Sequence, residues 1–194
     1  MAALFWRETP NKILIKRSKV ERLPMYVVRY SCKTLVELLR LPLKKLLEIA
    51  FKFPREFLRG FFDAEGHVDV AVGNQFHLAV GAENSNKQLL SRAKQLLKSL
   101  GINSRIARKR KAGSLKTIRG QTFAMRRTSY ALNIGKIDAI KLFAEKVGFS
   151  IPRKGRKLLD AISIIDTVAP VGRPKAWTQL YTKERGEWIR RGFG

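Results

Sequence analysis

The chain has 194 residues, of which 45% are hydrophobic, so one sizeable domain with a buried core can form. Its 40 Lys and Arg against 15 Asp and Glu give a net charge of +25. Such a charge calls for a polyanion, and we expect a nucleic acid; an acidic membrane surface and a ribosomal assembly are the alternatives. No apolar run is long enough to span a membrane, and none resembles a secretory signal. With Cys32 as the only cysteine, we expect an intracellular protein, cytoplasmic or organellar.

The first fifty residues read as short strands followed by short helices. Strands are expected at Ile13–Arg17 and Tyr26–Ser31, and helices at Thr34–Leu41 and Leu43–Ala50, separated by a proline. We treat residues 1–51 as an N-terminal β-β-α extension. Its order repeats the ending of the unit that follows, which would fit the remains of a first repeat.

A longer helix should begin near Pro54, because proline is favoured in the first turn of a helix. Its apolar residues recur at helical spacing up to Phe62. The next segment changes to a period of two, with "HVDVAV" and "QFHLAV" on either side of Gly73-Asn74. This pattern predicts a hairpin with one buried face and one polar face.

The remaining elements complete an α-β-β-α-β-β-α order over residues 52–167. Helices are expected at 86–100, 136–147 and 156–167, and strands at 102–111 and 126–134. The four strands should form an α+β domain whose sheet has one face on helices and one face free. Residues 104–130 hold nine Lys or Arg and no acid, so the free face could lie in a DNA major groove. From residue 168 to 194 we expect an extended, basic and aromatic tail.

Two carboxylates, Asp63 and Glu65, stand where the helix that begins near Pro54 should end. Each is unfavourable there by about 0.3–1 kcal/mol, because that end of the helix dipole is negative. Mutual repulsion adds to the cost. A hard cation such as Mg²⁺ would turn this cost into a favourable interaction, because it takes oxygen ligands. It can also activate a water for phosphodiester hydrolysis. The alternative is that both acids are merely solvated in a loop.

The stretch "LRGFFDAEG", Leu58 to Gly66, resembles the LAGLIDADG motif of the homing endonuclease family. It departs from the motif at Arg59, where the family usually has a small residue, and it has Glu65 where Asp is commoner. With the order of elements behind it, the resemblance covers residues 52–167. It implies the LAGLIDADG fold, with an antiparallel four-stranded saddle sheet on double-stranded DNA. It also implies cleavage with Mg²⁺ (or Mn²⁺) that leaves 3′ overhangs.

The resemblance also assigns roles to the site residues. Glu65 would bind the metal, with the backbone carbonyl near Ala64 as a further ligand. Asp63 would be structural, capping a neighbouring helix end, as part of a motif framework with Gly60 and Gly66.

The resemblance also suggests roles for two supporting residues. Asn84 would position the attacking water, and Lys154, which we favour over Arg153 and Lys157, would lie near the scissile phosphate. For these two, ordinary helix capping and a solvated run of charges are the alternatives.

The residues that read DNA should be the outward set on the strands. Arg suits guanine, Gln suits adenine and Asp suits the cytosine amino group. The set is Asp69, Gln75, His77, Arg105, Lys109, Arg127 and Ser129. His67 and His77 lack a partner at ligand spacing, so we expect them at the surface or facing DNA rather than on a metal.

The tail offers two readings. Its cations could contact flanking phosphate, or its tryptophans could pack it onto the domain. The residues concerned are Arg173, Lys175, Arg190, Arg191, Trp177 and Trp188.

A single motif supplies half an active site, so we expect a homodimer that cuts a near-palindrome. A pseudo-symmetric monomer, or a fragment of one, is the alternative. The function implied is that of a site-specific homing endonuclease, encoded by an intron or by a free-standing gene rather than embedded in an intein. A non-cleaving nucleic-acid binder on the same fold, either an RNA maturase or a transcription regulator, is the second hypothesis. A basic ribosome-associated protein is the third.

Overall fold

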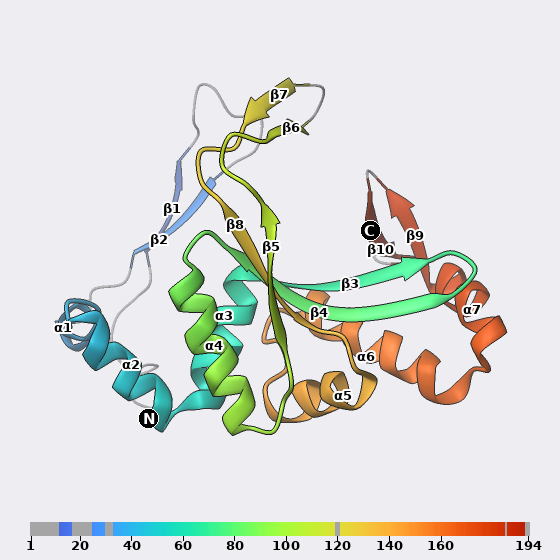
Figure 1. Ribbon diagram of the computed structural model, residues 1–194, viewed down its shortest axis with the longest axis horizontal. Helices are drawn as coiled ribbons and strands as arrows, with labels where there is room; N and C mark the ends of the chain where they lie inside the picture. Colours follow the sequence, from blue (N-terminus) through green and yellow to red (C-terminus); the bar gives the residue numbers. More distant parts are fainter. Residues whose placement is uncertain (1–11, 17–24, 30–32, 119–120, 185, 193–194) are drawn as a thin grey trace. The chain divides into compact units, whose positions relative to one another are not determined.

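In the computed structural model, residues 12–16, 25–29, 33–118, 121–184 and 186–192 are described (Figure 1). The chain divides into two compact units, Met1–Leu46 and Leu47–Gly194. Within the described residues, no helix is both long and apolar enough to cross a bilayer.

The first unit contains a small antiparallel ladder and a helix. Strand β1 (Lys12–Lys16) pairs with β2 (Met25–Arg29), and α1 (Lys33–Leu39) follows. Helix α2 (Leu43–Lys52) crosses the division between the units. These elements confirm the predicted β-β-α order, although the predicted strand ends at Arg17 and at residues 30–31 lie outside the described residues.

The second unit is built on a four-stranded antiparallel sheet with the order β3-β4-β8-β5. Its strands are β3 (Gly66–Val72), β4 (Phe76–Asn84), β5 (Arg105–Arg110) and β8 (Ser129–Ile134). The hairpin β3–β4 pairs Gly66 with Ala82 and Val72 with Phe76, as the alternating pattern predicted. Within this sheet, β3 and β5 are therefore the edge strands.

Four helices cover one face of this sheet (Figure 1). They are α3 (Pro54–Glu65), α4 (Lys87–Ser99), α5 (Ile137–Lys146) and α6 (Pro152–Thr167). The core is apolar, and rings such as Phe62 and Phe143 meet edge to face with centroids 4.7 Å apart. Each fully buried side chain of this kind contributes about 1.5–3 kcal/mol. The opposite face, here called the open face, carries His67, Asp69, His77 and Glu83 among others.

The connection between β5 and β8 differs from the prediction. It forms a second ladder, β6 (Leu115–Ile118) with β7 (Gln121–Ala124), which pairs within itself. The expectation of one strand over residues 126–134 is wrong at its start, because β8 begins at Ser129. Arg127 therefore lies in a bend and not on a strand.

The expectation of an extended tail after residue 168 is also wrong. A short 3₁₀ turn (Pro170–Gly172), α7 (Arg173–Leu180), β9 (Tyr181–Glu184) and β10 (Glu187–Arg190) form a folded C-terminal module. Trp177 is fully buried and stacks on Tyr181 with centroids 4.0 Å apart. Trp188 Nε1 donates a 2.9 Å hydrogen bond to the carbonyl of Val70, which fastens the module to the edge strand β3.

Candidate active site and nucleic-acid interface

Helix α3 delivers the two motif acids to one end of the sheet. Pro54 stands in its first turn, and Leu58, Phe61 and Phe62 bury its inner face. The helix ends at Gly66, whose backbone N–H bonds the carbonyl of Phe62. A Cβ at Gly66 would lie 2.4 Å from that oxygen, so only glycine allows the chain to leave the helix directly into β3.

Asp63 caps the start of helix α6. Its carboxylate accepts hydrogen bonds from the backbone N–H of Ser150, at 3.0 and 3.2 Å, and of Ile151, at 3.3 Å. The N-cap residue Ile151 has no side-chain oxygen of its own. Asp63 therefore satisfies N–H groups that helix α6 leaves unpaired, and its charge faces the positive end of that helix dipole.

Lys154 closes the other side of the same junction. Its Nζ donates to the backbone carbonyls of Asp63, at 2.7 Å, and of Phe62, at 3.2 Å. The carbonyl of Phe62 also accepts from the Gly66 N–H. Both carbonyls belong to the last turn of α3, so a cation lies at the negative end of that helix. Burial lowers the pKa of the Lys154 ammonium, and the charges of Asp63 and Glu65 oppose that shift. Lys154 lies inside the first turn of α6 and not before it, because the helix begins at Pro152 rather than Arg156.

Glu65 contrasts with Asp63. Its side chain is exposed, and it makes no hydrogen bond or ion pair with the described part of the chain. Ala64 beside it is also exposed. An exposed carboxylate next to backbone carbonyls suits a hard divalent cation, which prefers oxygen ligands. Among the described residues, however, no three His, Cys, Asp or Glu side chains form a metal-binding group, so these ligands are a partial set.

Asn84 ends strand β4 and starts the turn into α4. Its Oδ1 accepts a 2.8 Å hydrogen bond from the backbone N–H of Asn86. The Oδ1 of Asn86 in turn caps α4 by accepting from the N–H of Leu89 at 3.1 Å. The side-chain oxygen of Asn84 is thus engaged in local capping, the alternative that the sequence left open.

Glu83, the neighbour of Asn84 on β4, forms an ion pair with Lys109 across the open face. Both side chains are partly exposed. The carboxylate of Glu83 offsets one of the positive charges of β5, and the pair holds Lys109 against the sheet.

Sequence reasoning missed a close group at the centre of the open face. His67 lies opposite Gly81 in the register, and Gly81 lies opposite Asn133. A Cβ at Gly81 would lie 2.8 Å from Asn133 Oδ1 and 2.9 Å from His67 Nε2, so the missing side chain gives both groups their place. Burial is the main reason that the pKa of His67 is lowered. A glycine in the middle of a strand pattern was the available signal.

The predicted DNA-reading residues occupy several settings. Asp69, His77 and Arg105 lie on strands with exposed side chains. Gln75 lies in the turn between β3 and β4, and Arg127 lies in a bend. The hydroxyl of Ser129 is buried and has no hydrogen-bond partner among the described residues.

Comparisons with known proteins agree with this topology. The family model described as LAGLIDADG-like domain matches residues 52–148. An uncharacterized protein of Methanocaldococcus jannaschii is 37% identical over 139 residues, which cover 72% of this chain and 49% of that protein. The chain thus spans about half the length of the curated relative that it matches.

Solved structures of homing endonucleases are more distant. An archaeal intron-encoded enzyme, I-Vdi141I, complexed with DNA, has 16% identity and a TM-score of 0.40, over 60% of this chain and 71% of that one. I-CvuI, in complex with the I-CreI target in the presence of Mg, has 11% identity and a TM-score of 0.42, over 66% and 76%. Because these scores are low, the assignment depends on the family model, which covers half of the sequence, and on the motif at the end of α3. The chain belongs to the family of LAGLIDADG-like domains.

Proposed function

We propose that the chain is a site-specific homing endonuclease that cleaves both strands of DNA, with Glu65 as the metal-binding acid. The observation that carries the proposal is the contrast between the motif acids. Asp63 is held by two backbone N–H groups of the α6 start, whereas Glu65 is exposed and makes no such bond within the described residues. Stabilisation of the α6 start accounts for Asp63. A role as a metal ligand would account for Glu65, an exposed carboxylate at a helix end without a hydrogen bond or ion pair to the described residues.

The residues that would hold the metal are Glu65 and the backbone carbonyl of Ala64. When bound, Mg²⁺ or Mn²⁺ would supply an activated water and charge stabilisation for the leaving oxygen. The carbonyls of Phe62 and Asp63 hold the ammonium of Lys154 at the same junction. There its positive charge would orient a phosphate. Asn84, at the nearby end of β4, would orient the water through its amide group, since its oxygen is engaged in capping.

The open face would lie along the major groove, with Asp69, His77 and Arg105 exposed toward the base edges. Lys109 would contribute from its ion pair with Glu83. Gln75 and Arg127 would contact DNA from the turn and the bend in which they lie. Ser129 has its hydroxyl buried, so we expect the smallest contribution from it.

A second motif helix would complete the site. On α3, Gly60 and Ala64 are exposed, and a Cβ at Gly60 would meet nothing within 4 Å among the described residues. We propose that a second copy of the chain packs here, bringing a second Glu65 beside the first. The longer M. jannaschii relative leaves the alternative of both halves in one chain. Light scattering with and without DNA separates these, because a strict monomer that cleaves would exclude the homodimer.

The decisive experiment incubates the protein with a randomised duplex library and Mg²⁺ and sequences the new ends. We expect cuts at one recurrent, roughly two-fold site with short 3′ overhangs. Glu65→Gln should abolish them while the protein still binds. Glu56→Gln, which changes an exposed glutamate in the first turn of the same helix, is the matched control and should cut normally.

Cleavage that survives in Glu65→Gln would exclude the proposed role of this residue. Enrichment of one bound sequence without any cuts would instead indicate a non-cleaving binder, such as an RNA maturase or a transcription regulator. That the gene lies within an intron is also part of the proposal, and sequencing the genomic locus tests it.

A further inference from the structure

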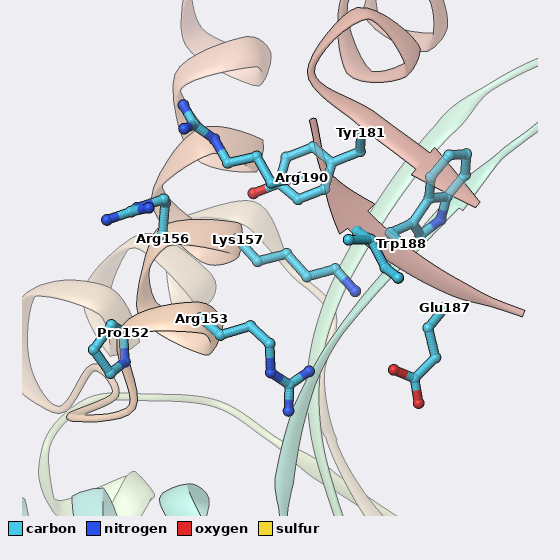
Figure 2. Close-up of a pocket in the computed structure, with 9 residues that line it drawn as sticks. Pro152, Arg153, Arg156, Lys157, Tyr181, Glu187, Trp188 and Arg190 are labelled. Carbon is cyan, nitrogen blue, oxygen red and sulfur yellow. The ribbon is translucent and has the colours of Figure 1, made fainter. Parts of the chain in front are cut away.

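Two adjoining cavities lie where the C-terminal module meets the sheet edge. One, of about 440 Å³, lies between the start of α6 and the β9–β10 hairpin (Figure 2). The other, of about 580 Å³, runs along β3 from Gly66 to Val72 and is here called the β3 cleft. Both share a wall of four residues: Arg153, Lys157, Glu187 and Trp188.

Cations from two separate elements converge on the β3 cleft. Arg153, Lys154 and Lys157 come from the first two turns of α6, and Lys183 comes from β9. Asp69 and Glu187 are the acids in its lining. The cleft therefore carries an excess of positive charge directly beside Gly66, one residue beyond Glu65.

Lys157 is the member whose setting is hardest to explain by folding alone. Figure 2 shows its side chain reaching from α6 toward the hairpin that carries Glu187 and Trp188. It is half-buried, and it makes no hydrogen bond or ion pair with the described residues. Burial lowers the pKa of its ammonium, as does Arg153, and the charges of Asp69 and Glu187 only partly offset this. A half-buried ammonium without a bonded anion is costly unless a ligand supplies one.

The cleft is held in shape by the module. Trp188 donates to Val70, and the Lys183 ammonium lies 5.8 Å from the Trp188 ring centroid. On the other side of the hairpin, Asp160 accepts from Tyr181 Oη at 2.8 Å and from Arg190 Nε at 3.0 Å. These contacts anchor β9 and β10 to both β3 and α6, so the cations are preorganised.

We propose that the β3 cleft holds the sugar–phosphate backbone of one DNA strand beside the cleavage site. The strand β3 is about 20 Å long, at about 3.3 Å per residue. The cleft is elongated, cationic and continuous with the motif, which suits a regular row of phosphates. This inference depends on the proposed function for its substrate, double-stranded DNA.

The test measures how binding depends on salt. Each phosphate contact contributes about 0.9 to the slope of log affinity against log salt concentration. Lys157→Gln combined with Lys183→Gln should lower that slope by about two, and equally for two unrelated duplex sequences, because phosphate contacts carry no sequence information. Lys183→Gln alone, on the exposed hairpin, should lower it by about one and avoids any folding defect at the half-buried Lys157.

Lys94→Gln is the matched control, since it removes an exposed lysine from α4, a helix that covers the other face of the sheet. Its slope should equal that of the wild type. If the cleft variants also behave as wild type while DNA still binds, the inference is overturned and the proposed function stands. If the wild type binds no duplex DNA, or prefers duplex RNA, both fail together. If the cleft variants lower the slope, and Glu65→Gln loses cleavage at an unchanged slope, both proposals are supported, because the cleft lysines then act in binding and Glu65 in cleavage.

Discussion

At its β3 edge the sheet is covered by the C-terminal module, whereas after its β5 edge strand the chain enters a separate ladder, β6–β7. Both edges are rich in cations, but they hold them differently. Beside β3, a fully buried Trp177 and a hydrogen bond from Trp188 fix the surrounding chain. On β6 and β7 every described side chain is exposed, including Leu115 at 74% and Phe123 at 50%. The β3 edge is therefore packed before any ligand arrives, while the described side chains of the β6–β7 ladder have no core beneath them.

The largest effect is expected from a substitution in the packed C-terminal module beside β3. Trp177→Ala should lower the free energy of unfolding by about 3–5 kcal/mol, because it leaves a cavity under the C-terminal module. Leu115→Ala, on the exposed ladder, should change it by less than about 0.5 kcal/mol. Urea denaturation of both variants measures the difference. Equal losses would mean that the two edges are held alike.

A smaller effect is expected at Asp63, at the start of the β3 edge. Asp63→Ala removes the acceptor for two N–H groups of the α6 start and should cost about 0.5–2 kcal/mol. Asp166→Ala, which breaks an exposed ion pair with Lys141, is the control and should cost about 0–1 kcal/mol. Denaturation midpoints compare the two. A loss at Asp166 that exceeds the loss at Asp63 would contradict the capping role.

The smallest effect concerns pH and the His67 group on the open face. The pKa of His67 is lowered from 6.5 in the folded chain, so the unfolded chain takes up the proton first as the pH falls. The free energy of unfolding should therefore be constant above about pH 6.5 and decrease below it. His67→Gln should remove this part of the decrease, and His77→Gln, which leaves His67 in place, should retain it. Urea midpoints at several pH values measure the slope, and an unaltered slope in His67→Gln would exclude this origin.

The sequence predicted the parts of the fold in which local pattern and tertiary packing agree. The motif helix, the β3–β4 hairpin and the α-β-β-α-β-β-α framework up to α6 followed from periodicity and turn residues, whereas the β6–β7 ladder did not. The start of α6 was misplaced, although Pro152 stands in its first turn just as Pro54 stands in that of α3. The preference of proline for the first turn, applied to Pro152 as well as to Pro54, would have predicted the start of both helices.

The C-terminal module could not be found in this way. Its helix α7 has eight residues and is rich in polar and small ones, so its stability comes from the burial of Trp177 and not from its own pattern. The site was predicted only in outline. The acids could be located from the motif, but the partners of Asp63, Lys154 and Asn84 come from segments up to 92 residues away, or from a turn whose geometry no spacing specifies.

The bonds of Asp63 predict which motif acid a member of this family would lose first once selection for cleavage ends. Substitution of the exposed Glu65 would remove no bond to the described residues, so an inactive descendant can lose it while remaining folded. Substitution of Asp63 would remove the carboxylate that accepts from the backbone N–H groups at the start of α6. Glu65 should therefore vary before Asp63 does among descendants that bind without cleaving.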